Sequence, residues 1–148
     1  MKNFLKNTAI SFAVLTTMSS AVIAPAYAAE TLPVVQTQNT QLAGSFTKKK
    51  YAIKGQWQII EQSGQRVLRL SDDFKTKKGP DLKLFLSPQT LAAVTGQTAT
   101  QNAVQLSVLK TNKGSQDYII PVGLNLASFQ SLLIHCEAYS VLWGGSDL

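Results

Sequence analysis

Polar and apolar residues alternate with a period of two along several short stretches of this chain, as they do in half-buried β-strands. The clearest stretch is Leu82–Leu86, in which every second residue is a leucine. Val104–Leu109 alternates in the same way. Two further apolar stretches, Lys54–Ile60 and Arg66–Ser71, flank a Ser-Gly pair, and this arrangement predicts a β-hairpin.

Three segments between and after these stretches are expected to have other structures. Ser87–Val94 predicts a short helix, because a serine can cap it and a proline fits its first turn. Gln116–Ile120 is expected to form a strand, which the following proline ends. Asn125–Phe129 is expected to form a helical turn or corner.

The longest apolar run in the second half of the chain is Ser131–Trp143. We expect one buried strand here, broken or bulged near Glu137 and Ala138. With it, the chain has about seven to eight strands at roughly even spacing and almost no helix, which is typical of sandwiches and small barrels. The predicted fold class is therefore all-β, a β-sandwich of the jelly-roll or Ig-like type.

The N-terminal residues have the three parts of a secretory signal peptide. Lysines at positions 2 and 6 precede a moderately apolar stretch, and Ala26-Tyr27-Ala28 fits the small-x-small cleavage rule. We expect a signal peptide over residues 1–28, cleaved after Ala28, and a periplasmic or secreted mature protein. No second apolar stretch is long enough to span a membrane.

The composition of the remaining chain separates a leader from a domain. Residues 29–42 are rich in Thr, Gln and Asn, which predicts a flexible leader, and residues 43–148 are predicted to form the β-sandwich domain. The 148-residue chain has a formal net charge of +6, and its lysines gather in Lys48-Lys49-Lys50 and in Lys75, Lys77 and Lys78. Such clusters are commonly a solvated surface, and an anionic envelope surface is the alternative partner. No nucleic-acid recognition motif accompanies them, so nucleic acid is not an expected partner.

Several short motifs, in this order and spacing, together resemble the DM-thirteen domain family, an all-β module described as an electron-transfer domain. They are Gly44-Ser45-Phe46, Leu70-Ser71-Asp72-Asp73-Phe74, Gly79-Pro80-Asp81-Leu82-Lys83-Leu84-Phe85-Leu86, Gly114-Ser115-Gln116-Asp117-Tyr118 and the segment Ile134–Gly144 around Cys136. The resemblance covers nearly all of the predicted mature chain. It implies a redox role in which Cys136, at the family's signature position, is the reacting group. The chain departs from the family pattern at His135, where an aromatic residue is more common.

Cys136 is the single cysteine of the chain, and an unpaired cysteine in an exported protein needs an explanation. It is either a reactive thiol or a small apolar filler of the core, and both interpretations stay open. His135 is a weak candidate for holding a cofactor, and a histidine at the surface or rim is the expected alternative. On a strand the two side chains point to opposite faces, so they share no ligand unless a bulge intervenes.

Haem, with Cys136 or His135 as an axial ligand, is the one cofactor that these residue types suggest, although no covalent attachment motif is present. Gly79, Pro80 and Asp81 are predicted to have a structural role, because proline fixes a turn and aspartate bonds the backbone that follows. No metal site is predicted.

Two classes of function fit these observations. The favoured one is a redox or electron-transfer accessory that uses Cys136 with an unidentified partner protein and has no independent catalytic turnover. The alternative is a non-catalytic envelope-binding or adhesion module, or a cofactor carrier, in which the cysteine is structural.

Overall fold

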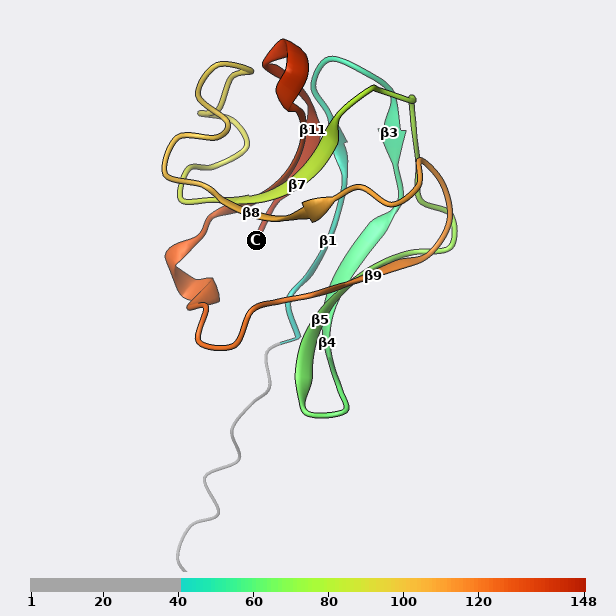
Figure 1. Ribbon diagram of the computed structural model, residues 1–148, viewed down its shortest axis with the longest axis vertical. Coiled ribbons are helices and arrows are strands. Elements are labelled where there is room, and N and C mark those ends of the chain that lie inside the picture. Colours follow the sequence, from blue (N-terminus) through green and yellow to red (C-terminus); the bar gives the residue numbers. More distant parts are fainter. Residues whose placement is uncertain (1–40) are drawn as a thin grey trace, which may run out of the picture. The chain divides into compact units, whose positions relative to one another are not determined.

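The computed structural model describes residues 41–148, which form an all-β domain (Figure 1). Two antiparallel sheets pack face to face as a sandwich, which confirms the predicted fold class. The predicted signal peptide and residues 29–40 of the predicted leader lie outside the described residues. Within residues 41–148, no helix has both the length and the apolar character needed to cross a membrane.

The first sheet has the strand order β1-β4-β5-β9 and the second the order β2-β11-β10-β7-β8. A third, two-stranded sheet pairs β3 with β6. The strands of the first sheet are β1 (Ala43–Ser45), β4 (Gln56–Gln62), β5 (Gln65–Leu70) and β9 (Gln116–Ile119). Those of the second are β2 (Thr47–Lys48), β7 (Leu82–Ser87), β8 (Val104–Val108), β10 (Ser131–Cys136) and β11 (Val141–Asp147). The short pair is β3 (Ile53–Lys54) and β6 (Lys75–Thr76).

The main core lies between the two large sheets. Alternate residues of β4 and β5 supply one wall, and the leucines at 82, 84 and 86 of β7 supply part of the other, as their period predicts. Burial of each such side chain contributes about 1.5–3 kcal/mol. Members of this core include Trp57, Ile59, Leu68, Leu70, Tyr118, Leu132, Ile134 and Trp143.

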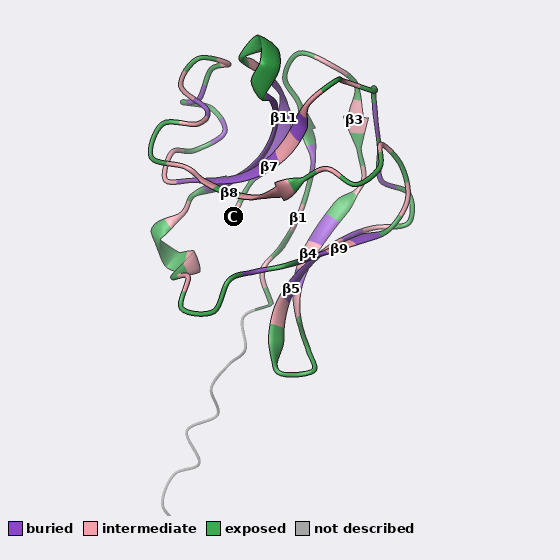
Figure 2. Ribbon diagram, in the orientation of Figure 1, coloured by how far each residue is buried: buried purple, intermediate pink, exposed green. Residues whose placement is uncertain are grey.

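A second, smaller core covers the other face of β7, β10 and β11. It consists of Phe85, Leu91, Val94, Ala99, Leu133 and Leu142. Its cover is the connection between β7 and β8, which has turns in place of regular secondary structure. As a result β7 and β10 are buried on both faces, and Figure 2 shows β7 and β11 buried in purple.

Two local predictions from turn chemistry are confirmed. β4 and β5 form a hairpin whose turn residues, Ser63 and Gly64, have positive φ values of 52° and 73°. This backbone matches the twist of the strands and explains the glycine. The helical turn predicted near residue 127 is a 3-10 helix, Leu126–Ser128, capped by the Asn125 side chain, which accepts a 3.2 Å hydrogen bond from the Ala127 amide.

The predicted helix at Ser87–Val94 is wrong. Ser87 is the last residue of β7, and its hydroxyl accepts a hydrogen bond from the Gln89 amide, which makes a tight turn instead of a helix cap. Beyond it, single turn bonds run from the Ala93 and Val94 amides to the Thr90 carbonyl. The chain then continues in turns, in which the Thr95 and Thr98 amides each donate to the hydroxyl of the other residue, and such local side-chain bonds compete with a helix.

The predicted break in the Ser131–Trp143 run has the right position, but the prediction of one strand is wrong. The chain reverses there: β10 and β11 are antiparallel partners joined by the 3-10 turn Glu137–Tyr139. Ser140 completes the reversal in the left-handed conformation, with φ of 50°. Both strands are buried on both faces along most of their length, so periodicity alone gave no sign of a hairpin.

The alternation predicted for Val104–Leu109 is interrupted by a bulge. Leu84 pairs with Ser107 and Phe85 with Gln105, so Leu106 has no partner of its own in the register. Leu106 packs against the main core, whereas Val108 is 53% exposed. β8 is an edge strand, and bulges are common at sheet edges.

Candidate functional site

Cys136 is the last residue of β10, and its side chain lies in the main core between the sheets. It pairs across the ladders with Leu82 of β7 and Val141 of β11. Its exposed fraction is 0%, and it is a free cysteine. The surrounding core is apolar and includes Trp143. The closed fold therefore presents no thiol at the surface, and a Cys136–Cys136 link between two folded chains has no access.

His135 occupies the opposite face of β10. It is 2% exposed, so the surface or rim position expected for it is wrong. Its Nε2 lies 2.8 Å from the Gly96 carbonyl oxygen, and because a carbonyl only accepts, Nε2 carries the hydrogen. Nδ1 is buried and has no hydrogen-bond partner among the described residues. Phe85 contacts the imidazole edge-on, with ring centroids 6.0 Å apart.

The segment that covers His135 is fixed by polar bonds to β10 and β11. The Leu91 amide donates to the Asp147 carboxylate at 2.6 Å, and the Ser131 hydroxyl donates to the Gln89 carbonyl at 2.6 Å. A methyl group added to Gly96 would overlap the Ser140 carbonyl oxygen, so the two backbones are in close contact. Glycine is required at this position for that approach.

The exposed turn that follows Cys136 is fixed to β7. Lys83 forms an ion pair with Glu137, and its ammonium is 3.4 Å from the Asp81 carboxylate. The hydrogen bond to Glu137 raises the pKa of Lys83, and the nearby Asp81 acts in the same direction. The Glu137 amide also donates to the Asp81 carbonyl at 3.1 Å. Figure 2 shows this turn as an exposed green coil at the top of the domain.

The Gly79-Pro80-Asp81 segment leads into β7 and lies against Trp143. A methyl group at Gly79 would lie 3.0 Å from the Trp143 ring and 2.9 Å from Leu82. The Trp143 indole N–H donates to the Lys77 carbonyl at 3.1 Å, and the centroids of the Trp143 and Tyr51 rings are 4.2 Å apart. The segment therefore borders a tryptophan that belongs to the same core as the thiol.

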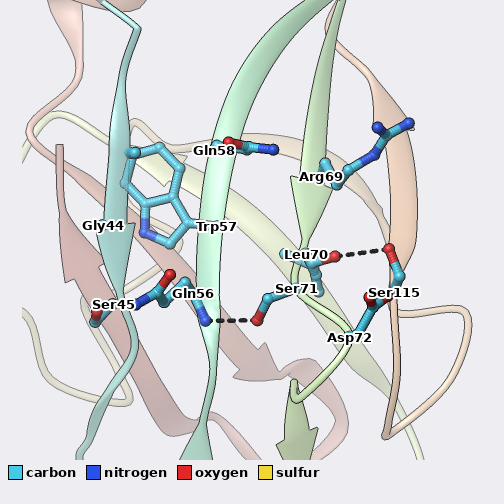
Figure 3. Close-up of a pocket in the computed structure, with 11 residues that line it drawn as sticks. Gly44, Ser45, Gln56, Trp57, Gln58, Arg69, Leu70, Ser71, Asp72 and Ser115 are labelled. Carbon is cyan, nitrogen blue, oxygen red and sulfur yellow. Dashed lines mark hydrogen bonds between the residues drawn. The ribbon is translucent and has the colours of Figure 1, made fainter.

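A groove of about 490 Å³ lies along the ends of the first sheet (Figure 3). It is lined by polar side chains such as Gln56, Ser71 and Ser115, together with Arg69. The Ser71 hydroxyl accepts from the Gln56 amide at 2.8 Å, and the Ser115 hydroxyl donates to the Leu70 carbonyl at 3.0 Å; both bonds are drawn in Figure 3.

The guanidinium of Arg69 on β5 is already bonded within the domain, so only part of it could bind a ligand. It donates to both carboxylate oxygens of Asp117 on β9, at 2.7 and 2.5 Å. This hydrogen bonding lowers the pKa of Asp117. This pair was not predicted from the sequence, although opposite charges at outward positions of two predicted strands were an available signal.

Lysines from three parts of the sequence meet at the short β3–β6 sheet. Lys54 pairs directly with Lys75, and Lys75 also forms a β-bridge with Lys113. We call Lys54, Lys75 and Lys113 the lysine row. Together with the other exposed lysines of these segments it forms the basic surface: Lys48, Lys49, Lys50, Lys54, Lys75, Lys77, Lys78 and Lys113. Lys54 and Lys113 lie outside the two lysine clusters predicted from the sequence.

The structure thus defines a class of protein, a two-sheet antiparallel β-sandwich with one buried thiol. The protein family is shown by the sequence: the model of the electron-transfer DM13 family matches residues 45–147, so the chain belongs to this family. The predicted resemblance is confirmed. No curated protein and no solved structure shows significant similarity to the chain.

Proposed function

We propose that this protein is an exported accessory domain of electron-transfer systems, which assists a redox partner and has no turnover of its own. Family membership supports the electron-transfer setting, and the signal-peptide pattern over residues 1–28 supports export. In contrast to the interpretation favoured from the sequence, Cys136 is not the reacting group of this accessory role, and the observation behind this difference is the position of its side chain. A thiol with no exposed surface, inside an apolar core, has the environment of an inert packing group rather than of a nucleophile.

Haem does not fit the closed domain at either candidate ligand. Cys136 and His135 lie on opposite faces of β10, and packed apolar side chains fill the space on each face. The described grooves are lined by neither residue. The Nδ1 of His135 is buried and has no hydrogen-bond partner among the described residues, and the other ring nitrogen is bonded to Gly96 of the β7–β8 connection. The proposed function therefore includes no haem-dependent step.

A second candidate function is thiol redox exchange by Cys136 after local opening. Membership of an electron-transfer family favours it. So does the location of the thiol, because Cys136 is the residue immediately before the exposed Glu137–Tyr139 turn. In this case the turn would have to move away from β7, which requires the Lys83–Glu137 ion pair to break.

Thiol labelling separates the two candidates. The mature protein is treated with a maleimide at neutral pH, with and without denaturant, and labelling is followed by mass spectrometry; Cys136→Ala is the control for nonspecific labelling. The accessory role predicts labelling only when the chain is unfolded. Labelling of the folded protein that is accelerated several-fold by Glu137→Gln, without loss of global stability, would contradict it and support redox exchange.

Export has its own test. Protein recovered from outside the cytoplasm should begin at Ala29, as measured by intact mass or N-terminal sequencing. Recovery of an uncleaved chain confined to the cytoplasm would overturn the exported location and leave the family assignment unaffected.

A further inference from the structure

We propose that the basic surface is a docking site for the anionic phospholipid headgroups of a membrane surface, with the lysine row at its centre. This inference goes beyond the accessory role because it names a surface and a partner. It uses none of the residues around Cys136.

The lysine row is an arrangement that folding alone does not favour. Residues directly opposite on antiparallel strands have neighbouring side chains, and like charges in such pairs are destabilising. Here Lys75 faces Lys54 on one side and Lys113 on the other. A local electrostatic cost that the fold does not need is typical of a binding site.

Within the described part of the chain, no carboxylate forms an ion pair with a lysine of the basic surface. Among residues 41–148, the ion pairs are Arg69–Asp117, Lys83–Asp81 and Lys83–Glu137, and none includes a lysine of the basic surface. The three lysines of the row are exposed, so their ammonium groups are available to an external anion.

Backbone hydrogen bonds hold the segments that carry these lysines together. The Thr76 amide donates to the Asn112 carbonyl at 2.9 Å, and the Gly114 amide donates to the Phe74 carbonyl at 2.8 Å. These bonds fix the Lys113 segment against β6. In Figure 1, β3 stands at the upper right, near the orange chain that leads into β9.

The Lys48–Lys50 loop is fixed in a similar way. The Lys49 and Lys50 amides both donate to the Trp143 carbonyl, at 3.1 and 3.2 Å, and the Lys77 amide donates to the Ala52 carbonyl at 3.2 Å. The charges are therefore spread over an area built from several segments, rather than along one flexible tail. An area of this kind matches a layer of headgroups better than a single linear polyanion.

The chemistry of the surface favours lipid over an acidic protein. Protein interfaces have an apolar centre and are depleted in lysine. The exposed large apolar residues of the described chain are Val108, Ile119, Val122 and Tyr139, and none belongs to the basic surface. Lysines near an anionic membrane surface are attracted to its headgroups, at about 1 kcal/mol per lysine, so a surface with eight exposed lysines favours electrostatic binding.

The test is sedimentation of the mature protein with vesicles of phosphatidylglycerol and phosphatidylcholine, compared with vesicles of phosphatidylcholine alone. We expect binding only to the anionic vesicles, and loss of binding as salt is raised. The triple variant Lys54→Gln, Lys75→Gln, Lys113→Gln should bind roughly 100-fold more weakly, at about fivefold per lysine.

A matched variant controls for net charge. Gln65→Glu, Gln101→Glu, Gln105→Glu lowers the net charge by the same three units, through negative charges added at exposed positions outside the basic surface, and it should bind nearly as well as the parent protein. Equal loss in the two variants would overturn the assignment to the lysine row. Circular dichroism of both variants checks that they are folded.

The remaining outcomes are also decisive. Soluble polyphosphate added as a competitor should displace the protein from vesicles only weakly. Tight binding to polyphosphate without binding to anionic vesicles would overturn the lipid assignment. Binding to neither would overturn the docking site as a whole, whereas the accessory role would still be decided by thiol labelling.

Discussion

The two faces of β10 are both buried, but they are covered in different ways. The face with Leu132, Ile134 and Cys136 meets the other sheet, which contributes apolar side chains and needs no polar bonds in return. The face with Leu133 and His135 meets the irregular β7–β8 connection, which contributes backbone carbonyls as well. Buried carbonyls need hydrogen-bond donors. The comparison explains why the polar residue of the pair His135–Cys136 lies under the connection.

The largest expected difference between the two faces comes from truncating neighbouring leucines. Leu132→Ala should cost about 3–5 kcal/mol, because two rigid sheets cannot close on the cavity. Leu133→Ala should cost about 2–3 kcal/mol, because the irregular connection can relax into the space. Urea unfolding of both variants measures this difference. An equal or larger cost for Leu133→Ala would show that the connection is as rigid as a sheet.

A smaller and more local effect is expected at Gly96. Gly96→Ala should displace the connection from Ser140 and cost about 2–3 kcal/mol, as an overpacked contact does. Hydrogen exchange should become faster in residues 88–103 and stay unchanged in β4 and β5. Ala92→Ser, at an exposed position of the same segment, is the control and should have little effect. Uniformly faster exchange would mean that the two faces do not unfold separately.

Substitutions of Cys136 test whether the core around its side chain is apolar. Cys136→Ser should cost about 1–2 kcal/mol, because the new hydroxyl is buried without a partner. Cys136→Ala adds no polar group, so its free energy of unfolding should fall less than that of the serine variant. The order would be reversed if the core offered Cys136 a hydrogen-bond partner, and that result would weaken the packing role.

The smallest effect concerns the turn that joins the two strands. The pKa of Lys83 is raised by its bond to Glu137, so the corresponding stability is present below the unfolded pKa of about 10.4 and is lost as pH rises through the folded value. The free energy of unfolding, measured from neutral to alkaline pH, should therefore fall more in the parent protein than in Glu137→Gln. Parallel pH profiles would show that the ion pair does not stabilise the turn.

Local sequence signals predicted the parts of the fold that local chemistry determines. The Ser63-Gly64 turn and the alternating leucines of β7 are examples, and the placement of His135 and Cys136 on opposite faces follows from the strand period alone. The reversal after Cys136 could not be predicted in this way. Serine is not typical of the left-handed conformation that Ser140 adopts, and strands buried on both faces have no alternation.

The candidate site was predictable only in part for a related reason. The burial of His135 depends on Gly96, which is distant in sequence and lies in the connection whose first part was predicted as a helix. The lysine row depends on the pairing of two-residue strands, which carry almost no periodic signal. Long-range contacts of this kind appear only once the chain has folded.

The complete burial of the Cys136 sulfur matters during folding rather than in the folded protein. If the chain folds outside the reducing cytoplasm, as we propose, oxidants and other thiols can reach Cys136 only before the sheets close around it. A slow folding step would lengthen the time for which the thiol is exposed. Chains oxidised or cross-linked at Cys136 during that time would accumulate without reaching the folded state. Folding speed would then protect the sulfur, and no reductase would be needed afterwards.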